Sequence, residues 1–117
     1  MNQKKINFDI LQQVFPGECA IIGEEKVEQI AEGGIQLIKT EGGSNFDLST
    51  IISLLILTSS TITTTINVIN FLKKKGTDPT IDNIKKNTEI PDSELNQIPE
   101  EKLQEIYLIL IERMKDE

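Results

Sequence analysis

The dominant pattern in the chain is a run of 25 residues without a charged side chain, from Leu48 to Leu72. Thirteen of these residues are apolar and the other twelve are Ser, Thr or Asn. As an α-helix the run would be about 37 Å long, which exceeds the roughly 30 Å hydrocarbon core of a bilayer. It therefore predicts one long helix, capped by Asp47, that is either buried in protein or spans a membrane.

The polar and apolar residues of this run fall on separate helical stripes, a pattern that favours burial in a protein core or against a protein partner. The polar stripe consists of Ser53, Ser60, Thr64 and Asn67. Three lysines end the run, either as a solvated helix C-terminus or as the flank of a membrane anchor. The candidate interaction residues are the apolar stripe and these lysines: Ile51, Leu55, Ile62, Ile66, Ile69, Lys73, Lys74 and Lys75.

Before this run, the apolar spacing predicts a short helix from Ile6 to Val14, which Pro16 and Gly17 would end. Alternation of apolar residues over 5–10 leaves a strand open as the alternative. Residues 24–39 carry a second helical stripe, interrupted by a pair of glycines at 33 and 34. The pair either lies inside one helix or divides a helix from a strand over 35–39.

After the run, residues 79–91 allow two interpretations. We expect a small β-hairpin, in which two short strands meet at Lys86 and Asn87. The alternative is a helix-turn-helix beginning near Pro79. The last segment is clearer, because Pro99 and two glutamates precede apolar residues at helical spacing from Leu103 to Met114. Together these elements predict an α+β fold that is mostly helical, with an all-α fold as the alternative.

The composition describes one folded acidic domain over residues 1–117. The chain is 38% hydrophobic and 26% charged, and it has no His and one Cys, Cys19. These counts remove His-based catalysis, the usual zinc ligand sets and any intramolecular disulfide. Cys19 lies in an apolar setting that is typical of a buried, inert thiol. We therefore expect no enzymatic activity, no cofactor and no metal site.

The net charge of −7 speaks against a nucleic-acid partner held by a broad basic surface. No apolar run of signal-peptide length begins the chain, so a cytoplasmic location is expected, with membrane association through residues 47–72 as the alternative. The long helix and the last helix offer more apolar surface than the short flanking segments can cover. Self-association or a protein partner is therefore expected.

One resemblance covers about residues 43–114. The order FDLSTIISLLIL, the KKKG stop, a hairpin ending in NTEI and the closing PEEKLQEIYLILIER helix resembles the effector-associated constant component family of bacterial conflict systems. Residues 1–42 do not match the strand–helix–strand opening of such proteins. The resemblance implies a non-catalytic accessory domain coupled to effectors in bacterial defence, and it transfers no catalytic or ligand residues.

The expected function is therefore a non-enzymatic protein–protein interaction or adaptor domain. The first alternative is a single-span or membrane-surface protein anchored by residues 47–72. The second alternative is a helix-turn-helix domain that binds DNA.

Overall fold

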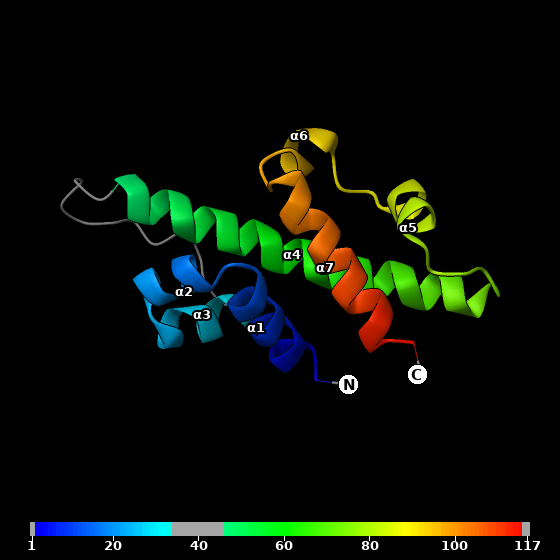
Figure 1. Ribbon diagram of the computed structural model, residues 1–117, viewed down its shortest axis with the longest axis horizontal. Coiled ribbons are helices and arrows are strands. Elements are labelled where there is room, and N and C mark those ends of the chain that lie inside the picture. The colour runs from blue at the N-terminus through cyan, green and yellow to red at the C-terminus, as the bar shows by residue number, and fades with distance from the viewer. Residues whose placement is uncertain (1, 34–45, 116–117) are drawn as a thin grey trace. The chain divides into compact units, whose positions relative to one another are not determined.

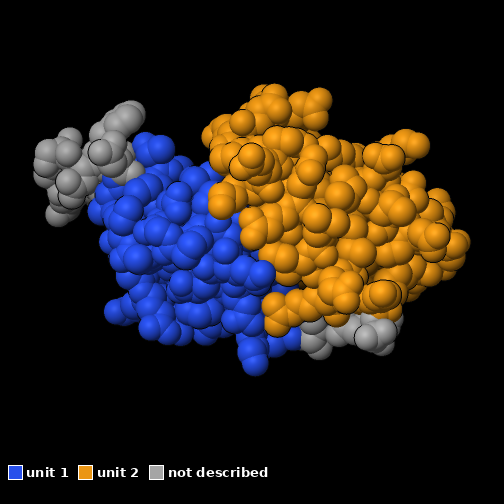
Figure 2. Space-filling view, in the orientation of Figure 1, with its two compact units in different colours: residues 1–60 blue, residues 61–117 orange. Residues whose placement is uncertain are grey.

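The computed structural model describes residues 2–33 and 46–115, and this part of the chain contains helices and no strand (Figure 1). The expected α+β class is therefore wrong, whereas the all-α alternative agrees with the structure. The helices are α1 (Gln3–Val14), α2 (Pro16–Ile22), α3 (Glu24–Ala31), α4 (Phe46–Lys74), α5 (Ile81–Asn87), α6 (Asp92–Leu95) and α7 (Glu100–Arg113). The chain forms two compact units, residues 1–60 and 61–117, and α4 contributes to both (Figure 2). That the two units make one domain stays a prediction.

In the first unit, proline and glycine set the boundaries of three short helices that pack against one another. Helix α1 ends at Val14 because the residue before a proline is pushed away from helical backbone angles, and Phe15 has φ −126° and ψ 58°. Pro16 then begins α2, where its missing N–H costs nothing. The predicted first helix and its end before Pro16 are confirmed, whereas α2 was not predicted.

Two glycines with positive φ follow the next helices. Gly23 (φ 92°) separates α2 from α3, and Gly33 (φ 76°) lies just beyond the end of α3. The continuous helix considered for residues 24–39 is wrong, because the chain turns through a left-handed residue after Ala31. The strand considered for residues 35–39 lies outside the described residues.

A buried hydrogen-bond network ties α1 to α3 and α4 within the first unit. The Asn7 side chain donates to Ser59 Oγ at 3.1 Å and to the carbonyl oxygen of Ala31 at 3.5 Å, and it accepts from Gln3 Nε2 at 2.8 Å. Ser59 Oγ donates to the carbonyl oxygen of Ile30 at 3.3 Å. The Ile30 carbonyl also accepts from the Gly33 backbone N–H at 3.0 Å, so these two side chains add hydrogen bonds at the C-terminal end of α3.

Helix α4 confirms the predicted long helix, although it begins at Phe46, one residue before the Asp47 expected to cap it. Its segment Leu48–Lys74 is long and apolar enough to cross a membrane, and half of the most apolar window is buried inside the protein. The core helix of a soluble protein meets the same test. Within α4, Thr58 Oγ1 donates to the Leu54 carbonyl at 2.7 Å, so its buried hydroxyl is satisfied by its own helix.

The β-hairpin expected at residues 79–91 is wrong, because residues 81–87 form α5. Thr80 caps this helix, its Oγ1 accepting from the Asn83 backbone N–H at 3.2 Å. Ile81 and Ile84 are three residues apart, which is helical spacing, and Ile84 is fully buried. Lys86 and Asn87, proposed as the turn, instead lie in the last turn of the helix, where lysine complements the helix dipole.

Helix α7 confirms the predicted C-terminal helix and supplies much of the core of the second unit. It begins at Glu100, directly after Pro99, and α5 packs against it. Its buried residues repeat at helical spacing and are Leu103, Ile106, Tyr107 and Leu110, followed by the buried Met114.

Candidate functional site

The structure places most of the predicted apolar stripe of α4 in the protein interior. Leu55, Ile62 and Ile69 have no exposed surface, and Ile66 is also buried. Ile51 is the member that is partly exposed. As placed, four of the five residues serve the core, so a partner can reach only Ile51 without a rearrangement. Their role in an interaction stays a prediction.

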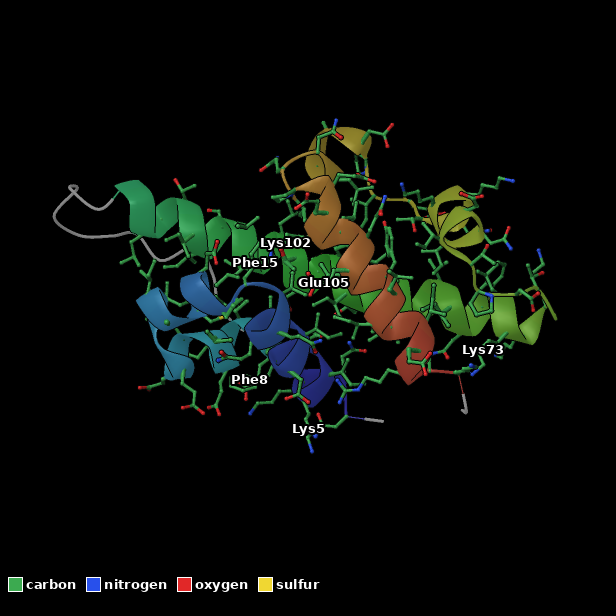
Figure 3. All side chains as sticks on the ribbon, viewed as in Figure 1. Lys5, Phe8, Phe15, Lys73, Lys102 and Glu105 are labelled. Atoms are coloured by element: carbon green, nitrogen blue, oxygen red, sulfur yellow. The ribbon has the colours of Figure 1, made fainter. Side chains whose placement is uncertain are left out.

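The three candidate lysines are not equivalent. Lys73 Nζ donates to the Met114 carbonyl oxygen at 2.7 Å, next to the C-terminal end of α7 (Figure 3). Lys75 Nζ lies 5.1 Å from the centre of the Phe71 ring, within reach of a cation–π interaction. Lys74 is exposed. Lys73 therefore has a structural task within the second unit, satisfying a carbonyl at a helix end.

A second row of apolar residues on α4 is more accessible than the predicted stripe. Leu48, Ile51, Leu54 and Leu57 follow one another at intervals of three residues, and each is partly exposed. Three residues fall short of a full turn, so the row winds around half of the helix, and Ile51 and Leu54 lie at its centre. We refer to these four residues as the α4 ridge. All four belong to the first unit and to the uncharged part of the helix. Large apolar side chains in a continuous row are the usual mark of an interaction surface, whereas scattered ones are ordinary.

The second unit contains a pocket of about 220 Å³ between α5, α6 and the first half of α7. Three apolar side chains, Ile90, Leu95 and Leu103, line it beside polar ones. The polar residues of the lining are Lys85, Thr88, Asp92, Asn96, Glu100 and Tyr107.

One ion pair organises the charges at this pocket. Lys85 Nζ lies 3.2 Å from Glu100 Oε1, and Gln104 Nε2 donates to the same oxygen at 3.3 Å. These donors, with Lys85 first, lower the pKa of the Glu100 carboxyl below its ordinary value. Asp92 lines the same pocket and makes no ion pair or side-chain hydrogen bond with any described residue. The lining therefore carries one more negative charge than positive charge.

Tyr107 is the unusual member of the lining. The residue is 0% exposed, and its hydroxyl has no hydrogen-bond partner in the described part of the chain. Burial raises the pKa of the phenol, and the Glu100 carboxylate raises it further. The phenol is thus neutral at physiological pH, and its hydroxyl can both donate and accept one hydrogen bond.

Cys19 behaves as its apolar setting predicted. It is buried, and its thiol donates to the Leu11 carbonyl oxygen at 3.4 Å. Burial raises the pKa of the thiol from 9.0 to about 11, and Glu18 adds to the shift. A thiol that is protonated and buried is a poor nucleophile.

Among residues 2–33 and 46–115, no group of three or more Cys, Asp or Glu side chains could hold a metal ion. Comparison with known proteins adds no assignment, because no family model, no curated protein and no solved structure matches this chain.

The pocket was not predicted from the sequence. On the sequence, Tyr107 falls among the residues at helical spacing from Leu103 to Met114, and Glu100 is one of the two glutamates that precede them. One feature of the sequence could have indicated the pocket: the single tyrosine of the chain places a hydroxyl at a position where the helical pattern predicts an apolar side chain. Six of the residues that line the pocket with Tyr107 lie between Lys85 and Asn96. Because a hairpin was expected there, their helical arrangement was not predicted.

Proposed function

We propose that this chain is a non-enzymatic protein–protein interaction domain, and that the α4 ridge is the surface with which it binds a second copy of itself. The observation that carries the proposal is the ridge: four large apolar side chains, each three residues from the next on α4 and all partly exposed. Their transfer from water to a protein interface is favourable by about 25 cal/mol for each Å² of apolar surface.

Charge favours a second copy as the occupant. The chain carries a net charge of −7, so most of its surface repels another copy. The ridge lies in the 25-residue uncharged run of α4, where two copies can meet without bringing like charges together. Association through this helix therefore has the smallest electrostatic cost that the sequence offers.

We further propose that the domain is an accessory to an effector in a bacterial defence system. The support is the resemblance of residues 43–114 to the effector-associated constant component family. The hairpin ending in NTEI, which formed part of that resemblance, is absent because residues 81–87 are helical. The uncharged helix, the KKKG stop and the closing helix retain their order.

Sedimentation equilibrium at low micromolar concentration tests the interaction. We expect a dimer or higher oligomer for the parent chain, and a shift toward the 13.1 kDa monomer for a variant with Ile51→Gln and Leu54→Gln. Asn70→Gln is the matched control, because it places the same side chain at an exposed position of the same helix outside the ridge. A parent chain that is monomeric, or a control that dissociates as fully as the ridge variant, contradicts the proposal.

Membrane attachment through α4 is the second candidate, and the length and apolar character of Leu48–Lys74 favour it. The exposed side of α4 favours contact with water over contact with lipid, because it carries polar residues: Ser53, Ser60, Asn67 and Asn70. Polar side chains facing lipid have no water to satisfy them. We therefore expect the untagged protein to stay in the supernatant after ultracentrifugation of a cell lysate. Recovery in the membrane pellet, with release only by detergent, would replace the interaction proposal with the anchor.

The second unit has two successive short helices where the helix-turn-helix alternative places them, α5 and α6, but the charge of the second helix does not suit DNA. Helix α6, the counterpart of a recognition helix, spans four residues and carries Asp92 and Glu94. Both carboxylates would face phosphates that repel them. We expect no binding to duplex DNA at physiological salt in a fluorescence-polarisation assay. Salt-sensitive binding that disappears with Lys85→Ala and Lys86→Ala would restore the alternative.

A further inference from the structure

The pocket of the second unit is too small for a cofactor or a drug-sized ligand. Its volume is about 220 Å³, whereas such ligands occupy pockets of about 300 to 1,000 Å³. A single amino-acid side chain fits this size. Pockets that receive one side chain of a partner are common centres of protein–protein interfaces, because a fully enclosed anchor contributes a large share of the binding energy.

The lining selects the chemistry of that side chain. Ile90, Leu95 and Leu103 offer apolar surface to an aliphatic stem. The Asp92 carboxylate has no partner in the described chain and is exposed, so it can meet a cationic group at the pocket. An anionic side chain would instead have to displace Glu100 from Lys85 and would be repelled by Asp92.

Tyr107 adds a buried polar group to the lining of the pocket. Most buried side-chain hydroxyls in folded proteins have a hydrogen-bond partner, and leaving one without a partner is costly. This hydroxyl is buried in a residue that lines the pocket and has no partner among the described residues. A planar guanidinium presents five N–H donors, enough to bind a carboxylate with two and still reach a second acceptor.

We infer that this pocket binds the side chain of one arginine from a partner protein, with the stem against the apolar lining and the guanidinium on Asp92. The inference rests on the proposed function in that the arginine belongs to a protein partner. The partner here is a basic segment and is separate from the second copy that covers the α4 ridge.

Binding can be measured directly because Tyr107 is the only tyrosine and the chain has no tryptophan. Its fluorescence therefore reports on the pocket alone. We would titrate the full chain with N-acetyl-arginine amide, and in parallel with N-acetyl-citrulline amide, which has nearly the same shape but no charge. We expect a saturable change in tyrosine emission with the arginine probe and affinity at least about tenfold weaker for the citrulline probe.

Two matched variants locate the contact. Asp92→Asn should weaken the arginine probe by at least about fivefold, because it removes the charge but keeps a residue that suits the start of a helix. Asp82→Asn, an exposed aspartate of α5 outside the pocket lining, should leave the affinity unchanged. Far-UV circular dichroism confirms that both variants fold.

Backbone amide shifts in a ¹H–¹⁵N NMR titration provide a second measurement for the case in which emission does not respond. Absence of binding by both methods, equal affinity for the two probes, or equal weakening by the two variants would overturn the inference. These outcomes are separable from failure of the proposed function, because self-association is scored independently through Ile51 and Leu54. A dimer that depends on the ridge but ignores the arginine probe would reject only the pocket.

Discussion

Replacing Asn7 with alanine removes the centre of the buried network in the first unit. Asn7 is 2% exposed, and its buried bond to Ser59 Oγ spans 3.1 Å. The 3.5 Å bond to the Ala31 carbonyl is at the outer limit of hydrogen-bond length and contributes less. A neutral buried bond contributes about 1 kcal/mol, and a buried group left without its partner adds a penalty. We therefore expect Asn7→Ala to lower the free energy of unfolding by about 2 kcal/mol.

Urea denaturation followed by far-UV circular dichroism measures this loss. With a slope of about 2 kcal/mol per molar urea, the midpoint should fall by about 1 M. Asn67→Ala is the matched control, because Asn67 is exposed on α4 and its loss should change stability by no more than about 0.5 kcal/mol. Introducing Ser59→Ala into the parent protein and into Asn7→Ala completes a double-mutant cycle, which should give a coupling energy of about 1 kcal/mol between Asn7 and Ser59. Equal midpoints for the two alanine variants would refute the structural role of the network.

Three further expectations follow from single residues. Tyr107→Phe should leave the urea midpoint unchanged or raise it, since the hydroxyl has no partner in the described chain; a loss above about 1 kcal/mol would reveal a bond that the structure lacks. The Cys19 pKa of about 11 exceeds its ordinary value of 9.0, so the unfolded chain ionises first and stability should fall as pH rises through this interval. Denaturation curves from pH 8 to 11 test this, with Cys19→Ala expected to flatten the dependence. Gly23→Ala should lower stability by about 1 to 3 kcal/mol because φ 92° and ψ 150° suit only glycine, whereas Gly17→Ala within α2 should lose nothing; similar midpoints for both would contradict the backbone assignment.

The sequence pattern alone was enough to predict a helix where that helix is long and has a clear apolar pattern of its own. The spacing from Leu103 to Met114 predicted α7, and the uncharged run predicted α4, because an amphipathic or apolar helix of several turns needs no distant partner to be recognised. Pro16 likewise marked the end of α1, since its ring restricts the residue before it regardless of context.

The errors arose where a short segment depends on its surroundings. Residues 79–91 contain two isoleucines at helical spacing, but a helix of seven residues is marginal in isolation, and the capping bond from Thr80 and the burial of Ile84 decide its form. The pocket could not be foreseen for the same reason. Its lining combines α5, α6 and α7, so the position of Tyr107 beside Asp92 and Lys85 depends on tertiary packing.

The short connections of the first unit have a consequence for how the chain folds. Single residues, Phe15 and Gly23, join α1, α2 and α3, so contacts among these helices are close in sequence and should form rapidly. The bond between Asn7 and Ser59 spans 52 residues and must wait for α4. At a synthesis rate of about 5 to 20 residues per second, Ser59 follows Ala31 by roughly 1 to 6 s. We therefore expect α1, α2 and α3 to pack together, with Asn7 in position, before α4 has been synthesised.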